Sequence, residues 1–359
     1  MASFRQGIVT EITERHADLI KCRVQLGDDQ LPCSAFPAML TSLDEGDEVI
    51  VNSTGVELAL GTGGEGFIVW NLSKGDDVPP GEGHIIKMRY TPWQTNVLVA
   101  EAPESPHHDV LAAAESLLGA PVVVCGLHSQ VGAAAAGIKA AAPDAKVGYL
   151  MTDGAALPLA WSDSVRSLKK AGLIDATCTS SHAFGGDLES VNAFSGMLAL
   201  RHAAEVDAIV VAMGPGVVGT DSRFGFTALE QGPLLDAAGA LGGEPIAALR
   251  ISFVDLRKRH VGVSHHTLTA LTIAAQRRCR VALPLLPDDR AEEVDEQLRS
   301  AGIFDKHEVV PIDGAPGLRS IQEKGLRPSS MGRSLDETPE LFVAASAAGA
   351  LGARFIPGV

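Results

Sequence analysis

The sequence predicts an α/β protein, in which a small N-terminal β-barrel-like domain precedes a doubly wound, mainly parallel sheet. Up to about Leu72 the chain carries short β-rich segments with no helix between them, whereas strand-like and helix-like segments alternate after His84. Hydrophobic residues make up 46% of the chain and aromatic residues only 4%, a mixture that suits helices packed closely on a parallel sheet. A length of 359 residues is enough for two domains.

The first domain is predicted over residues 1–74 as a barrel of the SH3 or OB type. Its β-rich segments are separated by turns that contain Gly and Asp, and they read GIVTEIT, LIKCRVQL, DEVIVN and GFIVWNL. An OB barrel can bind oligonucleotides, but this segment lacks the basic and aromatic residues that base stacking requires. We therefore expect a structural or dimerising module.

The second domain is predicted over residues 84–359 as Rossmann-like, and a Pro-, Gly- and Asp-rich linker at residues 75–83 precedes it. In such a fold, ligands bind beyond the carboxyl ends of the strands, near a switch in strand order. The residues that follow each strand are therefore the candidates for function. Predicted strands cover 96–100, 122–125, 147–151, 176–178, 208–213, 246–251, 281–285 and 309–312, and predicted helices cover 112–118, 131–142, 188–204, 228–241 and 292–301.

Three of these strands are followed by a side chain that can transfer a proton. His128 follows VVVCG, Asp153 follows VGYLM, and His182 comes shortly after DATCT. A histidine can act as a general acid or base near neutral pH, and a carboxylate can take a proton, orient a ribose or hold a metal. Asp153 could instead shape the turn TDGA, and Ser129 beside His128 could simply cap the next helix.

Two glycine-rich loops could allow a ligand to approach the backbone closely. The loop SSHAFGGD contains Gly185 and Gly186 just before a predicted long helix, which Asp187 could cap. The loop GPGVVGT fits the spacing GxGxxG, but it occurs in the fifth strand–helix unit rather than the first and has Pro at its second position. Helix and strand packing could equally explain its glycines. Its candidate ligand-binding residues are Gly214, Gly216, Gly219 and Thr220.

A basic segment, LRISFVDLRKRHVGVSHHT at residues 249–267, follows the sixth of these strands. We predict that Arg257, Arg259 and the helix that begins after Ser264 bind an anion such as phosphate, with His265 as a catalytic candidate. Arg259 and its neighbour Lys258 could also be ordinary solvated surface residues. The segment further contains Arg250, His260 and His266.

A divalent metal is the one cofactor that the residue types suggest. Because adjacent helical residues point about 100° apart, His265 and His266 are not expected to face one small ion together. A metal-dependent alternative therefore combines residues from separate strand ends and suits zinc, manganese or iron. Its candidate ligands are His128, Asp153, His182, Asp187 and one of His265 and His266.

The composition of the whole chain limits its partners. A formal net charge of −15 argues against nucleic acid as a ligand, although a small pocket samples only its local charge. The five cysteines are widely spread with no CxxC, so neither a disulfide framework nor a zinc knuckle is indicated. The sequence shows no signal-peptide pattern and no apolar run of the roughly 20 residues that a bilayer requires. We expect a cytoplasmic protein that does not bind membranes and forms a homodimer, the commonest oligomer.

Several of these motifs together resemble a family of uncharacterised bacterial proteins, the domain-of-unknown-function 3866 group. The resemblance covers nearly the whole chain and implies no activity, cofactor or catalytic residue. The motifs that carry it are HIIKMRYTPWQ, SPHHD, SSHAFGGDLESVNAFSG, MGPGVVGT, LGGEPIA and RKRHVGVSHHTLTAL.

Two functions remain open from the sequence. The first is an enzyme, a hydrolase or group transferase, that acts on a small anionic or phosphorylated metabolite at the carboxyl edge of the sheet; no GxSxG motif accompanies it. The second is a non-catalytic sensor or scaffold that binds a nucleotide or metabolite. In both cases the basic segment would form half of an anion pocket, and the loops SSHAFGGD and GPGVVGT would form the other half.

Overall fold

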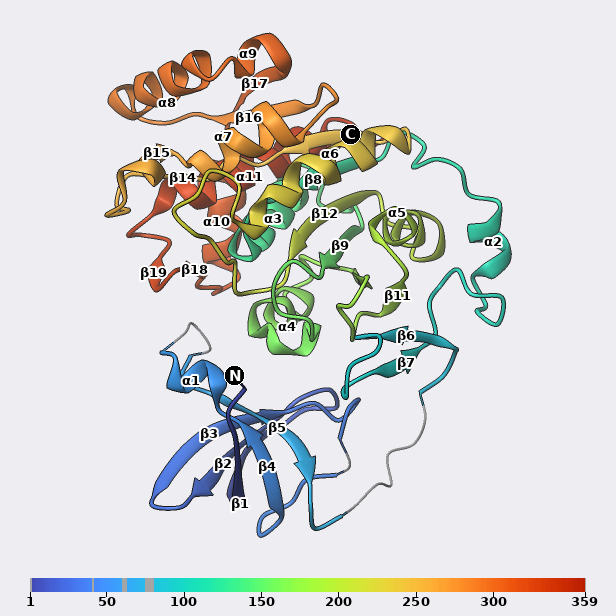
Figure 1. Ribbon diagram of the computed structural model, residues 1–359. Coiled ribbons are helices and arrows are strands. Elements are labelled where there is room, and N and C mark those ends of the chain that lie inside the picture. Colours follow the sequence, from blue (N-terminus) through green and yellow to red (C-terminus); the bar gives the residue numbers. More distant parts are fainter. Residues whose placement is uncertain (1, 41, 60–62, 75–80, 359) are drawn as a thin grey trace. The chain divides into compact units, whose positions relative to one another are not determined.

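The computed structural model describes residues 2–40, 42–59, 63–74 and 81–358 (Figure 1). Contacts divide the chain into two compact units, Met1–Leu98 and Val99–Val359. Residues 75–80 of the predicted linker lie outside the described residues, so the predicted domain boundaries stay a prediction.

The first unit contains a closed barrel of five strands in the order β1-β2-β3-β5-β4, which closes because β4 pairs with β1. Strand β2 shows why these residues form it: Ile20, Cys22, Val24 and Leu26 alternate with more exposed residues and fill the barrel. The predicted barrel is therefore confirmed. Its strands are β1 (Phe4–Arg15), β2 (Ile20–Leu26), β3 (Asp29–Ala35), β4 (Glu48–Asn52) and β5 (Gly66–Asn71), followed by the hairpin of β6 (Ile85–Lys87) and β7 (Thr95–Val97).

The second unit is built on an eight-stranded sheet in the order β11-β10-β9-β12-β8-β13-β16-β17, and every pair of neighbours is parallel. The predicted doubly wound α/β fold is confirmed. The predicted strand at residues 96–100 is divided in the structure. Its first residues pair with β6 in the first unit, and Val99 makes only an isolated parallel bridge to Glu189 of β11. The strands are β8 (Pro121–Val124), β9 (Val147–Thr152), β10 (Ala176–Ser180), β11 (Leu188–Ser190), β12 (Ala208–Met213), β13 (Glu244–Ala247), β16 (Arg280–Pro284) and β17 (Glu308–Ile312).

Helices cover both faces of this sheet, so its central strands are buried throughout. Val123 of β8 points into one core and its neighbours Val122 and Val124 into the other, and all six residues of β12 are buried. One core contains residues of α3 (Val131–Ala141), α4 (Asp163–Lys170), α10 (Ala315–Glu323) and α11 (Pro339–Ala353). The other contains residues of α2 (His108–Ala112), α5 (Ala193–Leu198), α6 (Gln231–Ala240), α8 (Asp288–Ser300) and α9 (Ile303–Lys306).

The strand order changes direction at the centre of the sheet. The connection from β8 to β9 runs through α3, whereas β12 is inserted between those two strands and continues through α6 on the opposite face. Loops that follow β8 and β12 therefore leave the sheet toward opposite faces. This is the arrangement that opens a ligand-binding crevice at the carboxyl edge of a parallel sheet.

Four local predictions need correction. The predicted helix at 188–204 begins as strand β11, and Asn192 caps α5 by accepting hydrogen bonds from the backbone of Phe194 and Ser195. Asp187 is not a cap, because its carboxylate binds Lys169 and Thr177. In the connection before α3, Gln130 rather than Ser129 accepts the backbone hydrogen bonds. The predicted helix at 112–118 lies mostly beyond α2, which ends at Ala112.

Among the helices that the structure describes, none combines the length and the apolar character that crossing a membrane requires.

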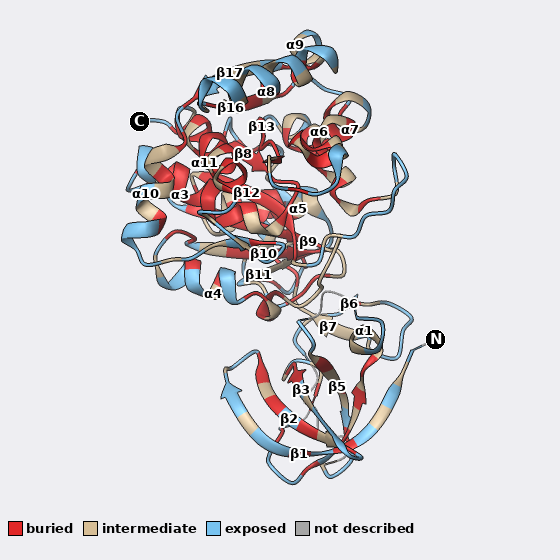
Figure 2. Ribbon diagram, turned by 90° about the vertical axis from the view of Figure 1, so that its left-hand side faces the viewer, coloured by how far each residue is buried: buried red, intermediate tan, exposed pale blue. Residues whose placement is uncertain are grey.

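Helices α3 and α11 lie in the buried part of this unit (Figure 2), and their backbones come into contact. A methyl group added at Gly349 would lie 1.9 Å from the carbonyl oxygen of Ala134, and one added at Gly137 would lie 2.0 Å from that of Ser346. Both helices are largely buried. Only glycine at these positions permits such an approach.

We predict that Gly349→Ala lowers the free energy of unfolding by about 1–3 kcal/mol, because the added methyl group overlaps backbone that cannot move away. Chemical denaturation measures this change. Gly239→Ala in α6 is the matched control, since the new methyl group would meet only Pro245 at 3.6 Å and Arg277 at 3.8 Å. The control should be neutral or stabilising by up to about 1 kcal/mol because Ala favours helix. Equal stability of the two variants would contradict the packing argument.

Candidate functional site

The basic segment after β13 folds back on itself and places Arg250 in the interior. The pair β14 (Ile251–Ser252) and β15 (Gly262–Val263) closes the loop, and α7 (His265–Thr269) follows. Arg250 is only 6% exposed. Its Nη1 donates to Nδ1 of His266 at 3.2 Å, and its Nη2 lies 3.9 Å from the Asp255 carboxylate.

Asp255 organises the arginines of this segment. Its two carboxylate oxygens accept Nε of Arg257 at 2.9 Å and Nη2 at 2.8 Å, and the backbone of Arg257 donates as well. These hydrogen bonds lower the pKa of Asp255 well below its usual range. Arg259 instead pairs with Asp221, whose side chain is 85% exposed. The Arg257 side chain is therefore held by Asp255, whereas the partner of Arg259 is a solvent-exposed carboxylate.

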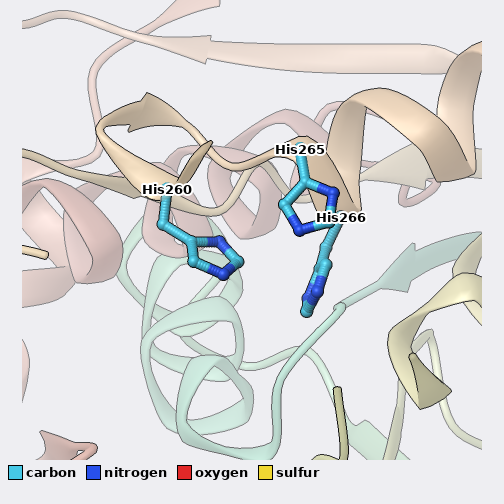
Figure 3. Close-up of side chains that lie close together, drawn as sticks. All are labelled: His260, His265 and His266. Carbon is cyan, nitrogen blue, oxygen red and sulfur yellow. The ribbon is translucent and has the colours of Figure 1, made fainter. Parts of the chain in front are cut away.

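Three histidine rings meet beside these arginines (Figure 3). The ring centroids of His260, His265 and His266 lie 4.4–4.9 Å from one another. Ser264 holds two of the three in place. Its hydroxyl lies 2.7 Å from Nδ1 of His260 and accepts the backbone N–H of His266, so Ser264 caps α7 as the sequence indicated.

Two ring nitrogens of this cluster are buried without a partner. Nε2 of His260 and Nε2 of His265 make no hydrogen bond within the described part of the chain. Burial, followed by the charge of Arg250, lowers the pKa of both His260 and His266 to about 3. Burial and the nearby arginines also lower the pKa of His265. The three imidazoles are therefore neutral at physiological pH.

The loop GPGVVGT reaches this histidine cluster. A methyl group at Gly219 would lie 3.2 Å from Cε1 of His266, and Phe226 stacks on the same ring at 3.9 Å between centroids. Gly214 at the start of the loop packs against the carbonyl oxygen of Ala156. Close packing therefore explains why both Gly214 and Gly219 lack a side chain. Gly216 has a φ of 101°, which favours glycine. Thr220 bonds to the carbonyl oxygen of Gly225 at 3.0 Å.

A carboxylate that sequence reasoning missed lies at the end of β9. Glu230, just before α6, accepts a hydrogen bond of 2.6 Å from Thr152, and it lies near Asp153. Burial raises the pKa of Glu230 to about 7; the bond from Thr152 opposes this change and the charge of Asp153 adds to it. Nothing in the local sequence singles out Glu230, because its environment is created by the distant end of β9.

The loop SSHAFGGD meets the Asp153 side of the same edge. The backbone N–H of His182 donates to Asp153 at 3.2 Å, and Phe184 exchanges backbone hydrogen bonds with Leu157 and Leu159. Gly185 has a φ of 92° and donates its N–H to Glu189. The N–H of Gly186 binds the Thr179 hydroxyl at 3.2 Å. That this loop completes an anion pocket with Arg257 and Arg259 stays a prediction.

His128 is held by hydrogen bonds on both ring nitrogens. Nδ1 lies 3.2 Å from the carbonyl oxygen of Met213 and must donate to it, so Nε2 accepts from the Ser162 hydroxyl at 2.7 Å. Burial lowers its pKa to about 4. Asp187 is likewise engaged with Lys169 and Thr177. Both residues therefore have partners within the protein, and their part in the metal set expected from the sequence stays a prediction.

A model of the family described as "Protein of unknown function (DUF3866)" matches residues 33–349. No curated protein matches the sequence. The family match covers most of the chain, and it confirms the resemblance drawn from the motifs.

We predict that stability depends on the ionisation of Glu230. A folded-state pKa of about 7 lies above the ordinary value, so the native state binds the proton more tightly than the unfolded chain does. Stability should therefore fall as the pH rises from about 4.5 to about 7, by about 3 kcal/mol. Glu230→Gln removes this dependence and keeps an acceptor for Thr152. Denaturation at pH 4 should find the two proteins alike, and denaturation at pH 8 should find the variant more stable; parallel pH curves would contradict the assignment.

Proposed function

The chain belongs to the DUF3866 family, and we propose from its own residues that it is an enzyme that acts on a small anionic metabolite, such as a phosphorylated one, at the carboxyl edge of the sheet. The observation that carries this proposal is the arrangement of Arg250, Arg257 and Arg259 around the histidine cluster, which concentrates positive charge in an acidic protein.

The local charge favours an anion. Arg250, Arg257 and Arg259 share two carboxylates, those of Asp255 and Asp221, and the same segment also contains the exposed Lys258. Guanidinium groups bind phosphate and carboxylate with two parallel hydrogen bonds, and a partly buried site screens this attraction less than bulk water does.

Arg259 is the best candidate to contact the ligand. Its Nε is buried with no hydrogen-bond partner among the described residues, and its Nη1 binds only the exposed Asp221. An anion could replace Asp221 and satisfy Nε as well. Arg257 would support the site indirectly, because it holds Asp255 in place beside Arg250.

Glu230 favours an enzyme over a sensor. A carboxyl group whose pKa is about 7 can both donate and accept a proton under physiological conditions. The segment from Gly214 to Glu230 links this group to the histidine cluster, since Gly219 and Phe226 contact His266. Hydrolysis or transfer of a phosphate-bearing group is the reaction class that we propose for an anion bound by arginine together with a carboxyl group that can donate or accept a proton.

We predict that inorganic phosphate and pyrophosphate raise the melting temperature of the wild-type protein and that Arg259→Met weakens this effect at least tenfold in apparent affinity. Lys258→Met is the matched control, because it removes the same charge from the neighbouring exposed position. It should change the apparent affinity less than threefold. Equal responses of the two variants would mean that phosphate binds by general charge attraction, and the proposed anion site would be wrong.

We further predict that Glu230→Gln keeps phosphate binding but abolishes turnover. A screen of phosphorylated metabolites for released phosphate or transferred groups identifies the substrate, and loss of at least 100-fold in kcat is expected when the general acid or base is neutralised. A variant that retains full kcat would exclude Glu230 from catalysis. Binding of phosphate without turnover of any substrate would favour the sensor.

A further inference from the structure

We infer that His260, His265 and His266 form a binding site for one divalent transition metal ion, with zinc as the best fit. Each histidine offers one ring nitrogen, and these three atoms lie within 4.8 Å of one another. The inference deepens the proposed function and rests on it only for the chemistry that follows metal binding; the site itself rests on the geometry of the three side chains.

The fold brings together residues that the helical periodicity of the sequence kept apart. His265 and His266 begin α7, and their rings diverge at an angle of 65° between planes. His260 lies in the short turn Lys258–His260 before β15, and its ring lies 4.9 Å from that of His265 and 4.8 Å from that of His266. This third ring, from another segment, completes a set that two adjacent histidines alone could not form.

Two buried ring nitrogens of the cluster are available to bind a metal ion. The bond between Nδ1 of His260 and the Ser264 hydroxyl fixes that ring and leaves Nε2 for the metal, as is usual for metal-binding histidines. His260 is only 1% exposed, so its unsatisfied Nε2 costs stability. Nε2 of His265 is likewise buried and has no hydrogen-bond partner among the described residues. A metal ion would satisfy both atoms at once.

His266 joins the set only when Arg250 releases it. Arg250 can only donate, so its bond occupies the lone pair of Nδ1 and leaves the ring proton on Nε2. Whichever nitrogen of His266 binds the metal, this bond must break. The Asp255 carboxylate lies 3.9 Å from Nη2 of Arg250 and can take over the guanidinium. Metal binding would thus shift Arg250 from His266 to Asp255.

Three imidazoles fit zinc and leave room for a fourth ligand. Zinc–nitrogen bonds of about 2.0–2.1 Å in a tetrahedral site require nitrogen atoms roughly 3.3 Å apart, so the rings must rotate inward from the present separations. Sites with three histidines keep one open position, at which zinc acidifies a bound water or binds an anion. An anion there would also offset the nearby arginines. We therefore expect metal and phosphate to strengthen each other's binding.

The test uses full-length, tag-free protein that has been dialysed against a chelator and then titrated with Zn²⁺ or Co²⁺. We expect one ion per chain, an increase in melting temperature and, with Co²⁺, the absorption spectrum of a tetrahedral site. His265→Gln should weaken zinc binding at least 100-fold while retaining the wild-type circular dichroism spectrum. His16→Gln in the barrel is the control with the same chemical change, and it should bind as the wild type does.

Two outcomes would overturn the inference: absence of stoichiometric zinc binding in the wild type, or affinity that is unchanged in His265→Gln. A second variant, His260→Gln, checks the same site from the other segment. Phosphate titrations of the metal-depleted protein separate the two proposals. Phosphate binding without zinc binding would remove only the metal site, whereas zinc binding without any phosphate response, in metal-depleted or loaded protein, would remove the anion site and keep the metal.

Discussion

The backbone contact between α3 and α11 is the constraint on which the larger unit depends. Gly137 and Gly349 let the two helices approach until a methyl group would meet the carbonyl oxygen of the partner helix at about 2 Å. The pair then covers the middle of one face of the sheet with mostly small residues. Because α5, α6 and α8 contribute to the core on the other face, strands such as β12 are buried along their whole length.

A parallel sheet covered in this way has one consequence for function. All its strands end at the same edge, so the polar residues that follow them gather there. β12 lies between β8 and β9, and the helices that follow β8 and β12 pack on opposite faces of the sheet. The loops that leave these two central strands therefore diverge. Glu230, Gly219 and the histidine cluster all belong to segments that follow this central part of the sheet.

Arg250 is the central charged group of the candidate site. Its buried guanidinium lies near the Asp255 carboxylate and donates to His266, and its charge disfavours protonation of His260 and His266. Neutral imidazoles keep lone pairs that can bind a metal, while the arginines favour an anion beside them. A metal site and an anion site can coexist here, since an anion bound to the metal ion would also be attracted by the arginines.

Much of the fold could be predicted because its causes are local. The alternation of Ile20, Cys22, Val24 and Leu26 indicates a barrel strand, and the all-apolar run of β12 indicates a central strand of a parallel sheet. Boundaries were less predictable. Asn192 rather than Asp187 caps α5, because Asp187 is drawn away by Lys169 and Thr177, which no local pattern shows.

From the amino-acid sequence alone we could predict the two-part architecture, the family and the concentration of basic residues and histidines after β13, because hydrophobic periodicity and composition can be read directly from neighbouring residues. Which of those residues lie together could be learned only from the folded chain. In the folded chain both ring nitrogens of His128 have hydrogen-bond partners, and Arg257 binds Asp255. His260 lies beside His265 and His266, and Glu230 lies beside Thr152. These outcomes depend on which loops meet after the strands are ordered, and strand order is a property of long-range packing.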